Sequence, residues 1–318
     1  MITAFRIQDG VFKLSEVRSE QEMEGAYWLD LKMPLATEIQ QVQSAFQLTL
    51  PTREEMEEIE PSDRLYTDGA AVYLTVSLIV TVADESPRLQ AVTFILTKNT
   101  LITIRHAEFF SFKNVVSQLR VPTEENDSAE ALFACIFEGI VDRVADLLES
   151  TVRRSENLTA KIFKYKDDKK ITNLELMRDL GRLSDTASAI RESLSTLFRA
   201  VVFARTRMAR KPTIEPRLNA VSADLTALNE QSNFVATKLQ FALDATLGMI
   251  NIEQNDIIKI FSVVAVIFMP PTMIASIYGM NFEVMPELKF TLGYPFVLLI
   301  MLASAICPFL YFKRKKWL

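Results

Sequence analysis

A short polar turn between two long apolar runs holds side-chain oxygens whose chemistry suits a cation. Asn281 offers an amide oxygen, and Glu283 and Glu287 offer two carboxylates against the one ammonium group of Lys289. A turn this polar cannot lie in lipid, so its polar atoms must face water or one another. The slight acidic excess attracts cations weakly, and the attraction multiplies if several chains assemble around one axis.

The runs on either side of this turn predict a transmembrane hairpin. Residues 260–278 and 290–312 contain no Asp, Glu, Lys, Arg or His, and each is close to the ~20 apolar residues that a helix needs to cross a bilayer. Lys259 precedes the first run and the basic residues 313–316 follow the second, so the positive-inside rule places both flanks in the cytoplasm and the turn outside. No signal peptide is recognisable at the N-terminus, and we therefore expect the long first part of the chain to be cytoplasmic.

The histidine and cysteine content argues against several kinds of chemistry. His106 is the only histidine, and Cys135 and Cys307 are expected in different compartments, so we expect neither a disulfide nor a metal site built from these residues. The sequence also lacks a Gly-rich phosphate loop, a Cys or His nucleophile arrangement and a His-Glu-x-x-His motif. We therefore expect no enzymatic activity, no bound cofactor and no nucleic-acid partner.

The first third of the chain has the alternation of a mixed β-sheet. Segments rich in Val, Ile and Thr predict strands at residues 2–7, 11–14, 27–31, 71–82, 89–97 and 101–105, with a helix at 37–48. From Phe109 onward, apolar residues recur every three or four positions instead of every two, which marks a helical half. Two long helices are predicted there, over 128–164 and 172–208, separated by a charged turn at 166–170.

A third helix begins near Ile214 and has no obvious end before the membrane. Only one glycine, Gly248, and no proline occur between Arg217 and Met269, so we expect one very long helix that passes from the cytoplasm into the bilayer. Its residues form a heptad seam, made of Leu218, Val221, Leu225, Leu228, Ser232, Val235, Leu239, Ala242, Thr246 and Met249. This seam either packs within the helical bundle of one chain or holds several subunits around an axis, where Ser232 and Thr246 would suit water. The unbroken entry into the membrane favours the axis.

The same three- and four-residue periodicity, continued into the first apolar run, predicts a helix face of small, weakly polar or flexible residues. It comprises Asn255, Ile258, Phe261 or Ser262, Ala265, Met269, Thr272 and Ser276, and it ends at Gly279, Met280 and Asn281. The opposite positions are apolar enough for lipid or a second helix: Val264, Ile267, Phe268 and Ile274. Such a stripe serves either a pore or ordinary close packing of membrane helices. Pro270 and Pro271 should kink or locally unwind the helix and leave backbone carbonyls without donors. These carbonyls either line a pore or are only a by-product of a structural kink between packed helices.

The order of these features along the chain resembles that of one known family. Tyr278-Gly279-Met280-Asn281 ends the first apolar helix, Met285-Pro286-Glu287-Leu288 follows in the turn, and Lys313-Arg314-Lys315-Lys316-Trp317-Leu318 follows the second helix. This arrangement resembles the CorA family of divalent-cation channels, whose signature is the Gly-Met-Asn turn. Over the soluble part the resemblance rests on the layout and on residues 251–255, so it is tight only over the last quarter of the chain.

This resemblance implies an α+β membrane protein that assembles as a funnel-shaped homopentamer in the inner (plasma) membrane, with both termini cytoplasmic. Each subunit would have an N-terminal cytoplasmic α/β domain, a long helical stalk and a C-terminal two-helix transmembrane hairpin. The implied division is an α/β domain at 1–125, a helical hairpin at 126–212, the stalk and first span at 213–278, the outer loop at 279–289, the second span at 290–312 and a basic tail at 313–318.

The resemblance also implies that magnesium, and cobalt or nickel, pass through the membrane along the predicted face. Gly279, Met280 and Asn281 would form the outer selectivity mouth, and Gly279 would permit a tight, left-handed end to the helix. A ring of neutral Asn281 amides would hold hydrated Mg2+, which gives up its waters reluctantly, whereas a ring of carboxylates would risk holding the ion too strongly to release it. Asn255 and Thr272 would line the pore, and Met269 and Phe261 would form hydrophobic constrictions. A plain helix cap is the alternative role for the Gly-Met-Asn turn.

The sequence departs from the family pattern at two positions. Phe261 stands where some relatives have an aliphatic residue, and Pro271 follows Pro270. Magnesium would also be the regulatory ion, because family members close when it fills acidic sites between neighbouring soluble domains. The candidates here are Glu54, Glu55, Glu57, Glu58, Glu60, Asp84 and Glu85, although an acidic run is usually a solvated face.

A ZntB-like zinc transporter and a membrane-anchored sensor without a pore remain the alternatives.

Overall fold

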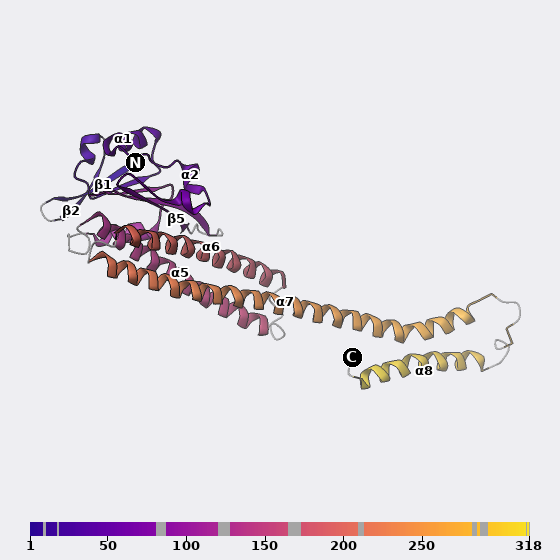
Figure 1. Cartoon of the computed structure of the whole chain (residues 1–318). Helices are drawn as coiled ribbons and strands as arrows, with labels where there is room; N and C mark the ends of the chain where they lie inside the picture. Colours follow the sequence, from indigo (N-terminus) through magenta and orange to yellow (C-terminus); the bar gives the residue numbers. More distant parts are fainter. Residues whose placement is uncertain are drawn as a thin grey trace. The chain divides into compact units, whose positions relative to one another are not determined.

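The structure of the whole chain is a computed structural model (Figure 1). It describes residues 1–8, 11–17, 19–80, 87–119, 128–164, 173–208, 213–281, 285–286, 292–315 and 317. The chain divides into two compact units, Met1–Leu243 and Asp244–Leu318, which we call the N-terminal and C-terminal units. The helix α7 (Ile214–Tyr278) contributes its first part to the N-terminal unit and its second part to the C-terminal unit.

The N-terminal unit is built on a seven-stranded mixed sheet. Its strands are β1 (Ile2–Gln8), β2 (Val11–Glu16), β3 (Trp28–Lys32), β4 (Leu65–Asp68), β5 (Ala71–Val80), β6 (Arg88–Leu96) and β7 (Leu101–Arg105), in the order β2-β1-β3-β7-β6-β5-β4. β3 and β7 run parallel, with Leu29 opposite Ile102, and the other neighbouring pairs are antiparallel. The mixed sheet predicted from the alternating pattern is therefore confirmed, whereas β4 was not predicted.

Helices cover both faces of this sheet (Figure 1). One face carries α1 (Ala36–Phe46) and α2 (Arg53–Glu57), whose Val42 and Met56 are buried on the apolar side chains of β1, β3 and β7. The other face carries α5 (Ala129–Lys164) and α6 (Asn173–Met208). The short elements are η1 (Glu20–Met23), α3 (Pro61–Arg64) and α4 (Phe110–Gln118). The N-terminal unit is therefore a three-layer α/β arrangement with the sheet in the middle.

Aromatic side chains fill the space between the sheet and the α5 layer. Trp28 is fully buried and stacks on Phe5 with ring centroids 4.2 Å apart, while Phe94 meets Phe137 of α5 edge to face at 5.1 Å. Aromatic pairs in these geometries stabilise a core by about 0.5–1.5 kcal/mol beyond the burial of their surface. This layer anchors the long helices on the sheet.

The long helix α5 begins where the sequence supplies a capping residue. The Ser128 hydroxyl accepts a hydrogen bond from the Ala131 amide at 3.2 Å, which satisfies one of the free N–H groups at the start of α5. The helices predicted at 128–164 and 172–208 are confirmed as α5 and α6. α6 is tied to the sheet at the Thr196 hydroxyl, which accepts a hydrogen bond from the Ser77 amide of β5 at 3.1 Å.

The first part of α7 packs against the other long helices of the same unit. Arg217 of α7 forms an ion pair with Glu138 of α5 at 2.6 Å, and the Phe163 and Phe241 rings lie 6.3 Å apart. Seam residues of α7 are at most 5% exposed in the single chain: Leu218, Val221, Leu225, Ser232, Val235, Leu239, Ala242 and Thr246. The heptad seam is therefore the packing stripe of a bundle within one chain as far as Ala242, and its assignment to an axis between subunits is wrong. Ser232 and Thr246 do not face water here.

Candidate functional site

The C-terminal unit contains the two helices predicted to span a membrane. The second part of α7 and the helix α8 (Gly293–Arg314) are each long and apolar enough to cross a bilayer. At about 1.5 Å per residue, the 22 residues of α8 extend over roughly 33 Å, which matches the ~30 Å hydrocarbon core. Its basic residues Lys313 and Arg314 fall in the last turn, where a cation also meets the negative end of the helix dipole.

α8 covers one side of the second part of α7. Val263 is completely buried, and the positions that share its face, including Ile267 and Ile274, are partly buried. At the basic end of the hairpin, the Lys259 ammonium lies over the Trp317 ring, 5.3 Å from its centroid, and Trp317 stacks on Phe312 at 5.6 Å. The two ends of the hairpin that carry the basic residues therefore lie together.

The predicted pore residues lie on the opposite side of α7. With about 100° of rotation per residue, Thr272 is roughly 180° from Val263, and Phe261 and Met269 lie within about 60° of Thr272. All of these side chains are exposed in the single chain: Ile258 by 62%, Phe261 by 70% and Met269 by 67%, with Asn255, Thr272 and Ser276 also exposed. The structure therefore brings most of the predicted residues onto one uncovered face, although Asn255 sits toward its edge.

Hydroxyl groups in this region are tied to the helix backbone. Thr272 Oγ1 donates to the Phe268 carbonyl at 2.7 Å, and Ser262 Oγ donates to the Ile258 carbonyl at 2.8 Å. Each hydroxyl hydrogen is thus used, and the oxygen lone pairs remain available as acceptors. Such oxygens can accept hydrogen bonds from water around a cation.

The paired prolines do not interrupt the helix. α7 continues through Pro270 and Pro271, so the local unwinding suggested by the sequence is not present. Because proline has no N–H, the carbonyl oxygens of Val266 and Ile267 still lack their helical donors. Those two carbonyls are the free backbone acceptors that the proline pair provides.

The helix ends at the Gly-Met-Asn turn without a residue in the left-handed conformation. The Gly279 amide donates to the Ala275 carbonyl at 2.9 Å, and the Met280 amide donates to the Ile277 carbonyl at 3.3 Å, which tightens the last turn. Among the described residues, positive φ angles occur at Met33, Gln47, Gly25 and Gly69, so the left-handed conformation expected at Gly279 is wrong. A Cβ atom at Gly279 would lie 3.2 Å from the Ala275 carbonyl oxygen, so close approach to the preceding turn favours glycine here.

Asn281 is exposed at the end of this turn. Its amide makes no hydrogen bond to another described residue, which leaves its oxygen able to face a ligand. The other predicted outer-loop residues, Glu283 and Glu287, lie outside the described residues.

The described acidic residues of the N-terminal unit do not form a metal site within one chain. The stretch 54–60 is mostly exposed, with Glu57 paired to Arg53, and Asp84 and Glu85 lie outside the described residues. Within the described part of the chain, no group of three His, Cys, Asp or Glu side chains is placed to hold a metal ion.

A second acidic group, on α5 and α7, was missed by the sequence analysis. Partial burial, together with the charges of Asp146, Glu138 and Asp224, raises the pKa of Asp142. The signal in the sequence was the four-residue spacing of Glu138, Asp142 and Asp146, which places them on one face of α5. The approach of Asp224 on α7 could not be read from that spacing.

Known proteins share this arrangement over the whole chain. Residues 23–314 match the family model described as CorA-like Mg2+ transporter protein. The magnesium transport protein CorA of Wolinella succinogenes is 35% identical over 325 residues, and that of Escherichia coli strain K12 is 34% identical over 319 residues, each alignment covering 100% of both chains. The complete structure of the CorA magnesium transporter from Methanocaldococcus jannaschii is similar, with a TM-score of 0.82 at 19% identity over 100% of this chain and 99% of that one.

Proposed function

The chain belongs to the CorA-like Mg2+ transporter family, and from that membership we propose that it carries Mg2+ across the membrane through a pore lined by α7. The observation that supports this most is the uncovered face of α7 opposite α8, on which Phe261, Met269 and Thr272 lie and which leads to Asn281. A helix that served only as an anchor would also expose a face to lipid, but that face would not need the hydroxyl groups of Thr272 and Ser276.

The pore would require several chains, and we infer a homopentamer. Beyond the buried seam, α7 exposes large apolar side chains in the N-terminal unit, with Phe234 exposed by 65% and Phe241 by 58%. Exposed apolar surface of this kind marks a contact with another protein surface, and assembly around one axis would cover it. The number five is the one that the family resemblance implies. Native mass analysis of the full-length protein in mild detergent should give pentamers, and monomers or dimers would favour the anchor.

Selection would take place at the ring of Asn281 amides. A neutral oxygen can accept hydrogen bonds from the waters of hydrated Mg2+ without displacing them, and it releases the ion more readily than a carboxylate would. Co2+ and Ni2+ in their hydrated forms would be accepted for the same reason. Met269 and Phe261 would form the hydrophobic constrictions that block ions by excluding water.

The direction of the hairpin and its regulation are part of the proposal. The basic residues at both ends of the hairpin would lie in the cytoplasm, with Gly279 to Asn281 outside. Cytoplasmic Mg2+ would close the pore. As the family resemblance implies, the regulatory ligands would lie between neighbouring chains; the described residues of one chain form no metal site, and Asp84 and Glu85 lie outside those residues.

Flux through the purified protein tests this function. Full-length protein in liposomes should admit Mg2+, reported by an entrapped dye, while protein-free liposomes should not. Parallel runs with Co2+, Ni2+ and Zn2+ identify the ion, and preference for Zn2+ would favour the zinc transporter. Absence of flux for every ion would leave the anchor as the better account.

A further inference from the structure

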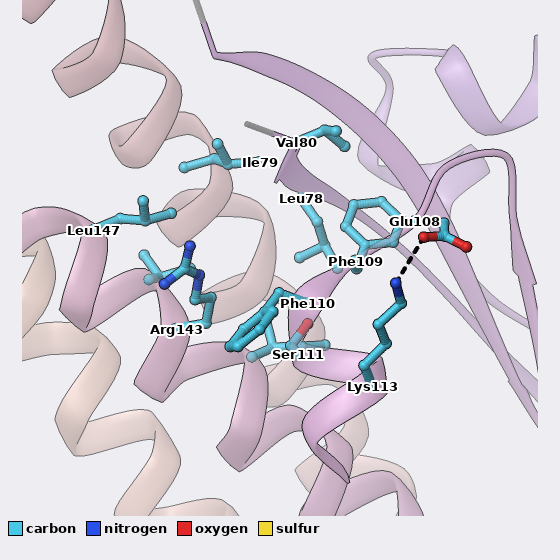
Figure 2. Close-up of a pocket in the computed structure, with 12 residues that line it drawn as sticks. Leu78, Ile79, Val80, Glu108, Phe109, Phe110, Ser111, Lys113, Arg143 and Leu147 are labelled. Atoms are coloured by element: carbon cyan, nitrogen blue, oxygen red, sulfur yellow. Dashed lines mark ion pairs between the residues drawn. The ribbon is translucent and has the colours of Figure 1, made fainter. Parts of the chain in front are cut away.

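A cavity of about 190 Å3 lies in the N-terminal unit, far along the chain from the proposed pore. It is formed where β5 ends, α4 begins and α5 passes by (Figure 2). Twelve residues line it: Leu78, Ile79, Val80, Glu108, Phe109, Phe110, Ser111, Lys113, Ile140, Arg143, Val144 and Leu147. Most of these side chains are apolar, and the polar ones are grouped at the start of α4 and on α5.

The start of α4 brings unsatisfied backbone donors to this cavity. Phe109 precedes the helix and supplies no side-chain hydrogen bond to it. The first N–H groups of a helix have no partner within the helix, and they carry the positive end of its dipole. Because Phe109, Phe110 and Ser111 line the cavity, these donors lie at its wall, where an anion is favoured.

The Ser111 hydroxyl is an independent sign that the cavity takes a polar ligand. Ser111 is only 5% exposed, and its hydroxyl forms no hydrogen bond with any described residue. Figure 2 shows its oxygen directed from α4 toward the space beside Phe109 and Lys113. Among the described residues, the unpartnered hydroxyls whose oxygens are fully enclosed are those of Ser193 and Ser232. The Ser111 oxygen is not fully enclosed and opens on the cavity, where water or a ligand must supply its hydrogen-bond partner.

The charges around the cavity sum to a positive value. The Arg143 guanidinium lies over the Phe110 ring, 5.1 Å from its centroid, and is paired with no carboxylate among the described residues. Glu108, the one carboxylate among the lining residues, is held by Lys32 and by Lys113 at 2.9 Å. These two ammonium groups hold the pKa of Glu108 at about 2, so its charge is present and already balanced.

We propose that this cavity binds a small organic anion, an apolar body that carries one carboxylate or phosphate group. The anionic oxygens meet the start of α4, the Ser111 hydroxyl and Arg143, whose planar guanidinium suits either group. The body packs on Phe109, Phe110 and the apolar side chains of β5 and α5. A bare metal cation does not fit these donors, because N–H groups and an arginine face the space.

Binding of fluorinated probes to the full-length protein in detergent tests the proposal. The probes are 4-fluorobenzoate and 4-fluorophenyl phosphate, observed by 19F NMR, with neutral 4-fluorobenzamide as the matched control. We expect saturable binding of at least one anion, and little binding of the amide. Which of the two anions binds more tightly identifies the group that the cavity prefers.

Variants separate the cavity from other sites. Arg143→Gln and Ser111→Ala should each weaken anion binding about tenfold or more, whereas Arg153→Gln, an exposed arginine of the same helix, should leave it unchanged. Glu108→Gln, which removes the competing carboxylate, should preserve or strengthen binding. Unchanged melting temperatures show that the variants fold.

Three results would overturn the proposal. The first is no saturable binding of either anion at millimolar concentration. The second is equal binding of the neutral amide, which would show an apolar cavity only. The third is unchanged affinity in both Arg143→Gln and Ser111→Ala, which would place the binding elsewhere, including in the detergent.

Discussion

Removing the Asp30 carboxylate should destabilise the N-terminal unit strongly. Asp30 of β3 accepts hydrogen bonds from Thr103 Oγ1 at 2.8 Å and from Arg105 Nη2 at 2.7 Å, and the Trp28 indole N–H donates to the same threonine at 3.0 Å. The Asp30 and Arg105 side chains are only 8% and 11% exposed. Asp30→Ala would therefore leave a nearly buried guanidinium without its counter-charge.

Breaking a buried pair from one side costs about 3–5 kcal/mol. For a unit of this size, each kcal/mol lowers the melting temperature by roughly 2–4 °C, so Asp30→Ala should lower it by roughly 6–20 °C. Arg153→Ala is the control: it breaks the exposed pair with Glu149, whose side chains are 61% and 65% exposed, and should cost only about 0.3–0.5 kcal/mol.

Urea unfolding of the full-length protein, with Trp317 replaced by Phe so that tryptophan fluorescence reports only on the buried Trp28, measures the two changes in the free energy of unfolding. Asp30→Asn keeps the shape but removes the charge, and should fall between the other two variants. If Asp30→Ala costs no more than Arg153→Ala, the network contributes nothing specific and this reasoning is refuted.

Three further predictions concern the gate, the mouth and the one histidine. Met269→Ser should raise Mg2+ leak through the closed protein in liposomes, because a hydrophobic ring excludes water. The control Leu299→Ser on α8, where Leu299 is equally exposed at 67%, should not raise the leak. If the two variants leak equally, Met269 is not part of the gate. Asn281→Asp should bind divalent ions more tightly and conduct them more slowly, measured as block of flux at rising Mg2+; unchanged flux would contradict an ion-contacting Asn281. Burial, reinforced by Arg53 and opposed by Glu57, lowers the pKa of His106 below 6.5. Between this lowered pKa of the folded state and the pKa of 6.5 in the unfolded state, the folded protein binds fewer protons. The free energy of unfolding should therefore fall as the pH drops below 6.5. His106→Gln should flatten that slope in urea titrations, and an unchanged slope would assign it to other groups.

The helices and membrane spans could be predicted because their patterns are local. The three- and four-residue periodicity predicted α5 and α6 to within a residue at each end, and the uncharged runs located both candidate membrane spans. The mixed sheet followed from alternation in the same way. These features depend on near neighbours in the chain, which the sequence displays directly.

The partners of those elements could not be predicted, because a periodic stripe does not say what it packs against. The heptad pattern placed Leu225 and Val235 in a predicted seam between subunits, but both side chains are buried within one chain. The Asp30–Arg105 pair joins residues that are 75 positions apart, and no spacing rule predicts it. At Gly279 the glycine suggested a left-handed turn, whereas close approach to the Ala275 carbonyl accounts for it.

The most direct test of the central proposal is Mg2+ flux through an Asn281→Ala variant in liposomes, with the oligomer measured in parallel. Asn281 is exposed at the end of α7, so the variant should fold and assemble like the wild type. The proposal predicts that Mg2+ uptake is lost or greatly reduced, and that cobalt hexammine, which cannot shed its ligands, inhibits the wild type. Normal uptake by the variant, or failure of the hexammine to compete, would contradict recognition of the hydrated ion by Asn281 and leave the residue as a helix cap.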